Sequence, residues 1–190
     1  MDGRELRLAL ALAYAGHSAK LGAQIRPYPS AEAAWEARDR WLPDESALRR
    51  QHLESPPTKQ LAWLATKDSD AWHLLALGDD GYPELLAALP DARGVLFVRG
   101  DRQILQHPQL AMVGARGGSA EGRNNAFRLA KALAARGFVI TSGLAAGIDA
   151  ASHEGALESG RSIAVMGTGP DSIYPARHAA LAEKMVAGGG

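Results

Sequence analysis

Hydrophobic residues in the first 80 positions recur at the spacing of amphipathic helices. Near the N-terminus, Leu6, Leu10 and Ala13 fall on one helical face. Further helical runs follow, and the breaker Ser55-Pro56-Pro57 precedes the last of them. The pattern predicts four short helices, beginning near Leu6, Ser30, Ser46 and Gln60.

After residue 80, short apolar and β-branched runs alternate with helical stretches. Strands are predicted over residues 95–98, 110–113, 138–141 and 162–166. Helices are predicted over residues 120–135 and from 148 to about 158, and a glycine follows each of them. Strands and helices in alternation form βαβ units. We therefore expect a parallel sheet of short strands covered by helices on both faces.

Composition changes between these two parts of the chain. All four tryptophans lie within residues 1–80, whereas 17 of the 21 glycines follow residue 80. We predict an all-helical (SAM-like) domain over residues 1–72, with tryptophans in its core, and a Rossmann-like domain over residues 73–190. The fold class is α/β, an extended Rossmann-like parallel sheet preceded by the helical domain. Because the chain stops after a helix at a glycine run, the C-terminal part of the sheet is expected to be missing.

Charge and cysteine content narrow the classes of function. The 21 basic and 21 acidic residues cancel, so an anionic ligand must be attracted locally and not by the whole chain. The absence of cysteine excludes disulfides, cysteine-bound zinc and thiol catalysis. Neither a transmembrane span nor a signal peptide is recognisable in the sequence. We expect a soluble, cytoplasmic protein without membrane partners.

Three glycine-rich loops follow the last three predicted strands. Parallel strands end at the same edge of a sheet, so the loops can face one groove. Glycine leaves backbone N–H groups accessible, and a helix with its positive dipole end begins after each of the first two loops. An anion is therefore the predicted ligand. The loops read Val113-Gly114-Ala115-Arg116-Gly117-Gly118-Ser119, Thr141-Ser142-Gly143-Leu144-Ala145-Ala146-Gly147-Ile148-Asp149 and Gly167-Thr168-Gly169-Pro170.

The first loop lacks the dinucleotide-binding pattern G-x-G-x-x-G. Counted from Gly114, the pattern needs glycine where Arg116 and Ser119 stand. An arginine in the second glycine position fills the space that a pyrophosphate requires, but its guanidinium can hold two phosphate oxygens. The P-loop pattern G-x-x-x-x-G-K-[ST] is absent as well. We predict phosphate binding by Arg116 without a nucleotide cofactor, and a helix-capping role for Ser119.

The helix after this loop carries positive charge. Residues 116–136 hold five basic residues, Arg123 among them, and one acidic residue. Such a run can flank a polyanion, but a charged helix face is commonly only solvated. Arg116 stands out because it lies in the loop itself.

Other candidate side chains have structural explanations. Asp149 and His153 lie one helical turn apart, which suits an acid–base pair or half of a metal site. A carboxylate that favours the helix dipole and bonds to the histidine explains them better, and we predict this structural role. His178 is predicted at a helix start. Tyr174 is predicted to pack at a turn, with stacking on a base as the alternative.

Several short motifs follow one another between residues 73 and 190. They are Tyr82-Pro83 with Leu85 and Leu86, Leu96-Phe97 before Gly100-Asp101, Val113-Gly114-Ala115-Arg116 with Ser119 and Gly122, Ser142 through Asp149 with His153, and Gly167-Thr168-Gly169 with Tyr174-Pro175. In this order and spacing they resemble the DNA processing protein A family, also called Smf, of bacterial natural transformation.

The resemblance implies an extended Rossmann-like fold that binds single-stranded DNA, protects it and helps to load a RecA-type recombinase. It implies no catalytic turnover, cofactor or metal, and a homodimer for the full-length family. By resemblance, Arg116 holds a DNA phosphate. The further DNA-binding residues implied or predicted are Gly114, Ser119, Ser142, Gly143, Gly167, Thr168 and Arg123.

The sequence departs from the family at two positions of the groove. Ala115 replaces a serine, and Ala146 replaces an arginine that is common in the family. The alternative function is a nucleotide-processing Rossmann-like enzyme of the phosphoribohydrolase kind. Its P-G-G-x-G-T-x-x-E loop is absent from this sequence.

Overall fold

The structure is a computed structural model that describes residues 27–28, 33, 36–40, 62, 65–66, 71–90, 92–93, 95–168 and 172–188. The four helices predicted within residues 1–72 lie almost wholly outside the described residues. The chain divides into two compact units, residues 1–98 and 99–190. The predicted domain boundary between residues 72 and 73 stays a prediction. No helix in the described ranges is long and apolar enough to span a bilayer.

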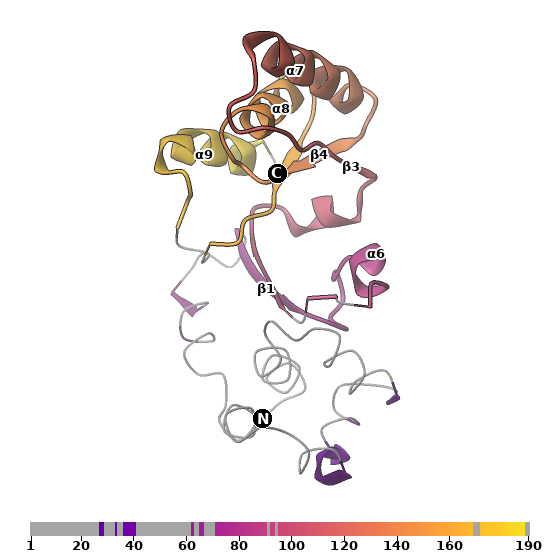
Figure 1. The fold of residues 1–190 in the computed structure, drawn as a ribbon. Helices are drawn as coiled ribbons and strands as arrows, with labels where there is room; N and C mark the ends of the chain where they lie inside the picture. The colour runs from indigo at the N-terminus through magenta and orange to yellow at the C-terminus, as the bar shows by residue number, and fades with distance from the viewer. Residues whose placement is uncertain are drawn as a thin grey trace. The chain divides into compact units, whose positions relative to one another are not determined.

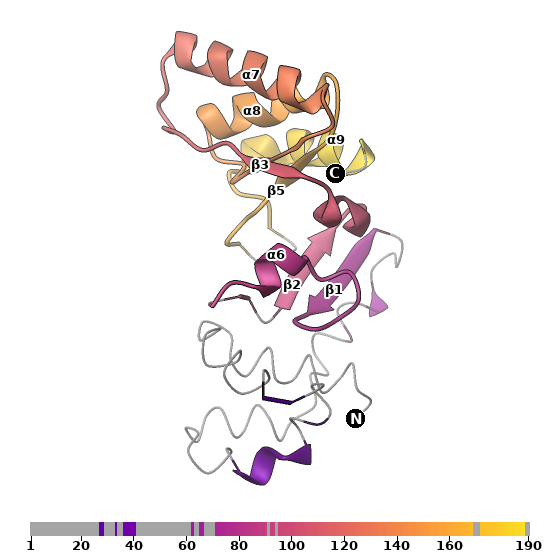
Figure 2. The ribbon, with the colours of Figure 1, turned by 90° about the vertical axis from the view of Figure 1, so that its right-hand side faces the viewer.

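In the first unit, the structure shows a two-stranded sheet. Strand β1 (Trp72–Ala76) pairs with β2 (Val95–Arg99), and the short helix α6 (Glu84–Ala87) lies between them in sequence (Figure 2). Tyr82 donates a hydrogen bond to the carbonyl of Arg93, and burial raises the pKa of Tyr82 to about 12. The strand predicted over residues 95–98 is confirmed, but it pairs with β1 and not with the parallel sheet.

The second unit contains the parallel sheet. Its strands are in the order β3-β4-β5, with Leu110 opposite Ile140 and Ile140 opposite Ser162. This confirms the α/β class and the βαβ units predicted from the sequence. The elements in chain order are η3 (Arg102–Gln106), β3 (Gln109–Ala111), α7 (Ala120–Ala134), β4 (Val139–Ser142), α8 (Ile148–Leu157), β5 (Ser162–Ala164), η4 (Ala176–His178) and α9 (Ala179–Ala187).

Helices α7 and α8 of this unit lie on one side of its sheet. Figures 1 and 2 show these two helices over the strands, with α9 beside α8. Both crossovers run in the same direction across the sheet, and right-handed crossovers then place their helices on the same face. The two crossover helices therefore cover the same face of the described sheet, and the expectation of helices on both faces stays a prediction.

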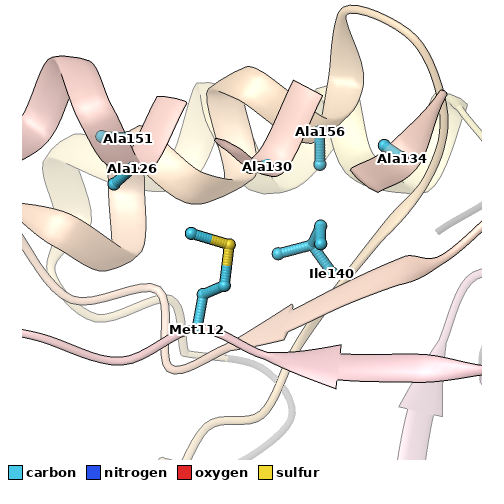
Figure 3. Packing of buried hydrophobic residues seen from close by; sticks show 7 residues of the cluster. All are labelled: Met112, Ala126, Ala130, Ala134, Ile140, Ala151 and Ala156. Atoms are coloured by element: carbon cyan, nitrogen blue, oxygen red, sulfur yellow. The ribbon is translucent and has the colours of Figure 1, made fainter. Parts of the chain in front are cut away.

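The core between helices and sheet is built mainly from alanine. Met112 and Ile140 project from the strand layer toward α7 and α8 (Figure 3). A second cluster joins Leu144, Ala182 and Met185 and fixes α9 to the rest of the unit. The buried alanines of the first cluster are Ala126, Ala130 and Ala134 on α7, and Ala151 and Ala156 on α8.

The backbones of α7 and α8 approach each other closely at Gly155. A Cβ atom at this position would overlap the carbonyl oxygen of Phe127 and would lie 2.8 Å from both the carbonyl carbon and the Cα atom of Phe127. Gly160, just after α8, is similarly close to Ala134, with its hypothetical Cβ 3.0 Å from the Ala134 carbonyl oxygen. Backbone contacts of this kind leave no room for a side chain.

We expect Gly155→Ala to destabilise the second unit. Alanine favours helices by about 1 kcal/mol over glycine, so helix propensity alone predicts stabilisation. Here the added methyl group must push α8 away from α7, and overpacking typically costs about 1–3 kcal/mol. Urea denaturation followed by circular dichroism measures the change. Gly117→Ala is the control, because no atom lies within 4 Å of its hypothetical Cβ; a more stable Gly155→Ala variant would contradict the close packing.

Candidate functional site

Three loops leave the carboxyl ends of β3, β4 and β5. Because the strands are parallel, the loops start from one edge of the sheet, as the sequence predicted. The first loop covers residues 112–119, the second 143–147 and the third starts at residue 165. Gly169 and Pro170 of the third loop lie outside the described residues.

The first loop is held by its own backbone and by the start of α7. The N–H of Gly118 donates to the carbonyl of Ala115 at 3.2 Å. Ser119 caps α7, since its hydroxyl oxygen accepts from the N–H of Gly122 at 3.0 Å, which confirms the predicted cap. The Arg123 guanidinium donates to the carbonyl of Gly118. Arg123 was predicted to bind DNA, but part of its guanidinium is already bonded to the loop.

Arg116 lies at the turn of this loop and is exposed. Within the described part of the chain, its guanidinium has no hydrogen bond or ion pair. The backbone N–H groups of Arg116 and Gly117 have no partner there either, and those of Ala120 and Glu121 begin α7. A helix N-terminus with unpaired donors attracts anions, and the guanidinium adds a full positive charge.

The first and second loops contact each other through glycine positions. Gly147 has a φ of +83°, and a Cβ atom there would lie 2.5 Å from the Arg116 carbonyl oxygen. Ile148 donates its N–H to the carbonyl of Ala115 at 3.3 Å, and its side chain would lie 2.7 Å from a Cβ on Gly114. Gly114 and Gly147 thus allow the loops to meet. Sequence reasoning assigned Gly114 to the ligand and did not consider that the apolar Ile148, at the end of the second loop, could pack against it.

Asp149 organises the second loop. Its Oδ2 atom accepts hydrogen bonds from the N–H groups of Gly143, at 3.2 Å, and Ala145, at 3.3 Å. The carboxylate is buried, and Leu144 between the two donors has a positive φ of 59°. The N–H of Gly143, predicted to face a DNA strand, is therefore already bonded within the protein.

Ser142 has a structural role as well. Its side chain is 4% exposed, and its hydroxyl donates to the carbonyl of Met112 at 2.6 Å, joining β4 to the chain after β3. The one hydroxyl proton is used there, so this hydroxyl has no donor left for a ligand. The third loop differs: Gly167 and Thr168 are exposed, and Thr168 donates to the carbonyl of Ser172 at 2.9 Å. Of the residues predicted to bind DNA, Arg116 and Gly167 have the most open surroundings.

His153 is bonded to Ser162 and not to Asp149, so the predicted bond between Asp149 and His153 is wrong. The Ser162 hydroxyl donates to the carbonyl of Ile140 at 2.6 Å, so it must accept from the His153 Nδ1–H at 2.7 Å. The Nε2 atom of His153 is buried without a partner among the described residues. Burial lowers the pKa of His153 to about 4, against the opposing charge of Asp149. The ring is thus neutral near pH 7.

Neither catalytic interpretation of this pair is supported by its surroundings. The carboxylate of Asp149 and the Nδ1 atom of His153 are both engaged in structural hydrogen bonds. In the part of the chain that is described, no group of three histidine or acidic residues is placed to hold a metal ion. The structural role predicted for both residues therefore stands, with different partners.

Two further predictions concern His178 and Tyr174, which follow the third loop. His178 occupies the N-cap position of α9, as predicted for a helix start, but its side chain makes no capping hydrogen bond. Its Nδ1 atom instead lies 2.8 Å from the Leu144 carbonyl oxygen. Tyr174 is 65% exposed, so the prediction that it packs at a turn is wrong. The neighbouring Ile173 provides the packing contact to the cluster around Leu144 instead.

Acid should weaken the fold through His153. A histidine with an ordinary pKa of 6.5 in the unfolded chain binds a proton below that pH, whereas the folded form resists protonation down to about pH 4. The free energy of unfolding is therefore expected to fall by roughly 3 kcal/mol between pH 6.5 and pH 4. Urea denaturation at half-unit pH steps measures this loss. In the His153→Gln variant, the number of protons taken up on unfolding, which sets the slope of this pH dependence, should be smaller by about one.

The control for this measurement is His107→Gln, which removes an exposed histidine. An unchanged pH dependence in His153→Gln, or the same change in both variants, would show that His153 is not the titrating group.

Comparison with known proteins gives consistent results. Residues 73–190 match the family described as DNA recombination-mediator protein A. Protein Smf of Escherichia coli is 42% identical over 142 residues, which cover 74% of this chain and 36% of that protein. The crystal structure of DNA processing protein A from Streptococcus pneumoniae has a TM-score of 0.62 and 33% identity, covering 72% of this chain and 47% of the other.

A structure of DNA processing protein A from Helicobacter pylori, described for its unique single-stranded DNA binding mode, has a TM-score of 0.55 and 28% identity. The match covers 62% of this chain and 53% of that one. The chain thus spans about a third to a half of the length of these relatives. The matched residues include all three loops, the sheet and α7 to α9, and the chain belongs to the DNA recombination-mediator protein A family, also known as DprA or Smf.

Proposed function

We propose that this chain binds single-stranded DNA at the carboxyl edge of the β3-β4-β5 sheet and takes part in recombination during natural transformation. One observation carries the proposal: Arg116 is an exposed, unpaired cation on a loop that is fixed beside the start of α7. Support comes from family membership and from the relative described for single-stranded DNA binding.

A phosphate suits this position. The guanidinium offers two parallel donors to phosphate oxygens, and the nearby unpaired backbone N–H groups contribute without reading the sequence of bases. The third loop, with the exposed Gly167 and Thr168, lies at the same edge of the sheet, where a DNA strand held by Arg116 would continue. Binding of this kind is independent of sequence and sensitive to salt.

The proposal includes no chemical step and no cofactor. Asp149 and His153, the pair best placed for acid–base chemistry by sequence, are engaged in structural bonds. The nucleotide-processing alternative therefore has no supporting observation among the described residues. Loading of a RecA-type recombinase, protection of the strand and dimer formation belong to the proposal for the whole protein.

Arg116→Ala should reduce the affinity for a labelled oligo-dT by about tenfold or more at low salt, because one charged hydrogen-bonding group is lost. The slope of log affinity against log salt should decrease by about 0.7, the value for one phosphate contact on a single strand. Fluorescence anisotropy across a salt series measures both quantities.

Arg136→Ala is the matched control, since it removes the same charge just beyond the opposite end of α7. Equal losses in the two variants would show a general charge effect and contradict a specific phosphate contact at Arg116. A thermal-shift series with AMP, ATP and NADH tests the enzyme alternative, because a nucleotide ligand should raise the melting temperature.

A further inference from the structure

Tyr174 exposes an aromatic ring close to the proposed DNA site. It belongs to residues 172–178, here called the tyrosine segment, which follows the third loop. Tyr174 is 65% exposed, whereas the neighbouring Ile173 is half-buried against the cluster of Leu144, Ala182 and Met185. The segment therefore packs one apolar residue inward and directs the next one to solvent.

The backbone around Tyr174 is fixed on both sides. Before it, the carbonyl of Ser172 accepts from the Thr168 hydroxyl at 2.9 Å. After it, the N–H of His178 donates to the carbonyl of Pro175 at 2.9 Å, and the His178 ring bonds to the Leu144 carbonyl at 2.8 Å. The bond between His178 and Leu144 joins the tyrosine segment to the second loop, so the backbone that carries Tyr174 is held at this edge.

The chemistry of the surrounding surface suits a nucleobase. Arg177 lies three residues after Tyr174, is exposed, and has no side-chain partner among the described residues. Val165, directly after β5, is also 63% exposed. An exposed aromatic face and an exposed cation in one short segment match the two parts of a nucleotide, in which a flat apolar base is linked to a phosphate. Every base has such a face, so this recognition tolerates any sequence.

We propose that Tyr174 stacks on a base of the bound single strand, with Arg177 beside it at the following phosphate. This rests on the proposed function, since the strand is the one held by Arg116. Arg116 then fixes the phosphate backbone, while Tyr174 contributes an interaction that depends on the base. The two contributions can be separated by removing bases from the ligand.

The test compares oligo-dT with an oligonucleotide of the same length that contains only abasic sites. Tyr174→Ala should weaken binding of oligo-dT by about 5- to 150-fold, the range for loss of one stacked base. It should leave the affinity for the abasic strand and the salt slope unchanged. Tyr174→Phe keeps the ring and should bind both ligands as the unmodified chain does. Fluorescence anisotropy with the whole chain gives the six affinities.

Phe138→Ala is the control for loss of an exposed aromatic residue. Phe138 is 38% exposed and precedes β4, at the opposite edge of the sheet. The stacking proposal would be overturned if Tyr174→Ala weakened the binding of both ligands equally. It would also be overturned if Phe138→Ala weakened the binding of oligo-dT as much as Tyr174→Ala does. Melting temperatures confirm that each variant is folded, and little packing is lost at an exposed ring.

The failure of this inference differs from the failure of the proposed function. If the unmodified chain binds neither ligand at low salt, the DNA-binding proposal itself fails. If it binds both, and Arg116→Ala weakens both while Tyr174→Ala weakens neither, only the stacking proposal fails.

Discussion

The contact between the backbones of α7 and α8 is the constraint on which the second unit depends. Neighbouring strands are about 4.8 Å apart, whereas packed helices are usually 8–10 Å apart, so helices over adjacent strands are crowded. Gly155 relieves the crowding by admitting Phe127 of α7 directly against α8. The small side chains of the buried alanines let the two helices stay close over the rest of their contact. The starts of the two helices, and the loops that lead into them, are positioned by this contact.

Glycine therefore has two separate roles in this chain. Gly114, Gly147 and Gly155 are required where another part of the protein approaches too closely for a Cβ atom. Gly117 and Gly167 have open space around them and remain accessible to a ligand. The high glycine content after residue 80 suggested a binding surface along all three loops. Among the described loop glycines, those with open space around them lie at the turn beside Arg116 and in the third loop.

Local signals in the sequence were sufficient for the helices and strands of the second unit. Ser119 marks the start of α7, and Gly137 follows its end, so its predicted range is nearly the observed one. Strand β1 was missed, because its five residues show no alternation of apolar and polar positions. Partners distant in sequence were not predictable either. His153 lies one helical turn from Asp149, yet it bonds to Ser162, which only the pairing of β4 with β5 brings close.

The hydrogen bond from Ile148 to Ala115 also affects how a ligand would bind. Ordering one flexible residue costs about 1–2 kcal/mol of conformational entropy. A loop that became ordered only on contact with a strand would lose that free energy from the affinity. In the free protein, the first and second loops already contact each other, and Asp149 holds the second loop in place. The edge is thus preorganised, so association need not wait for a conformational change in these loops.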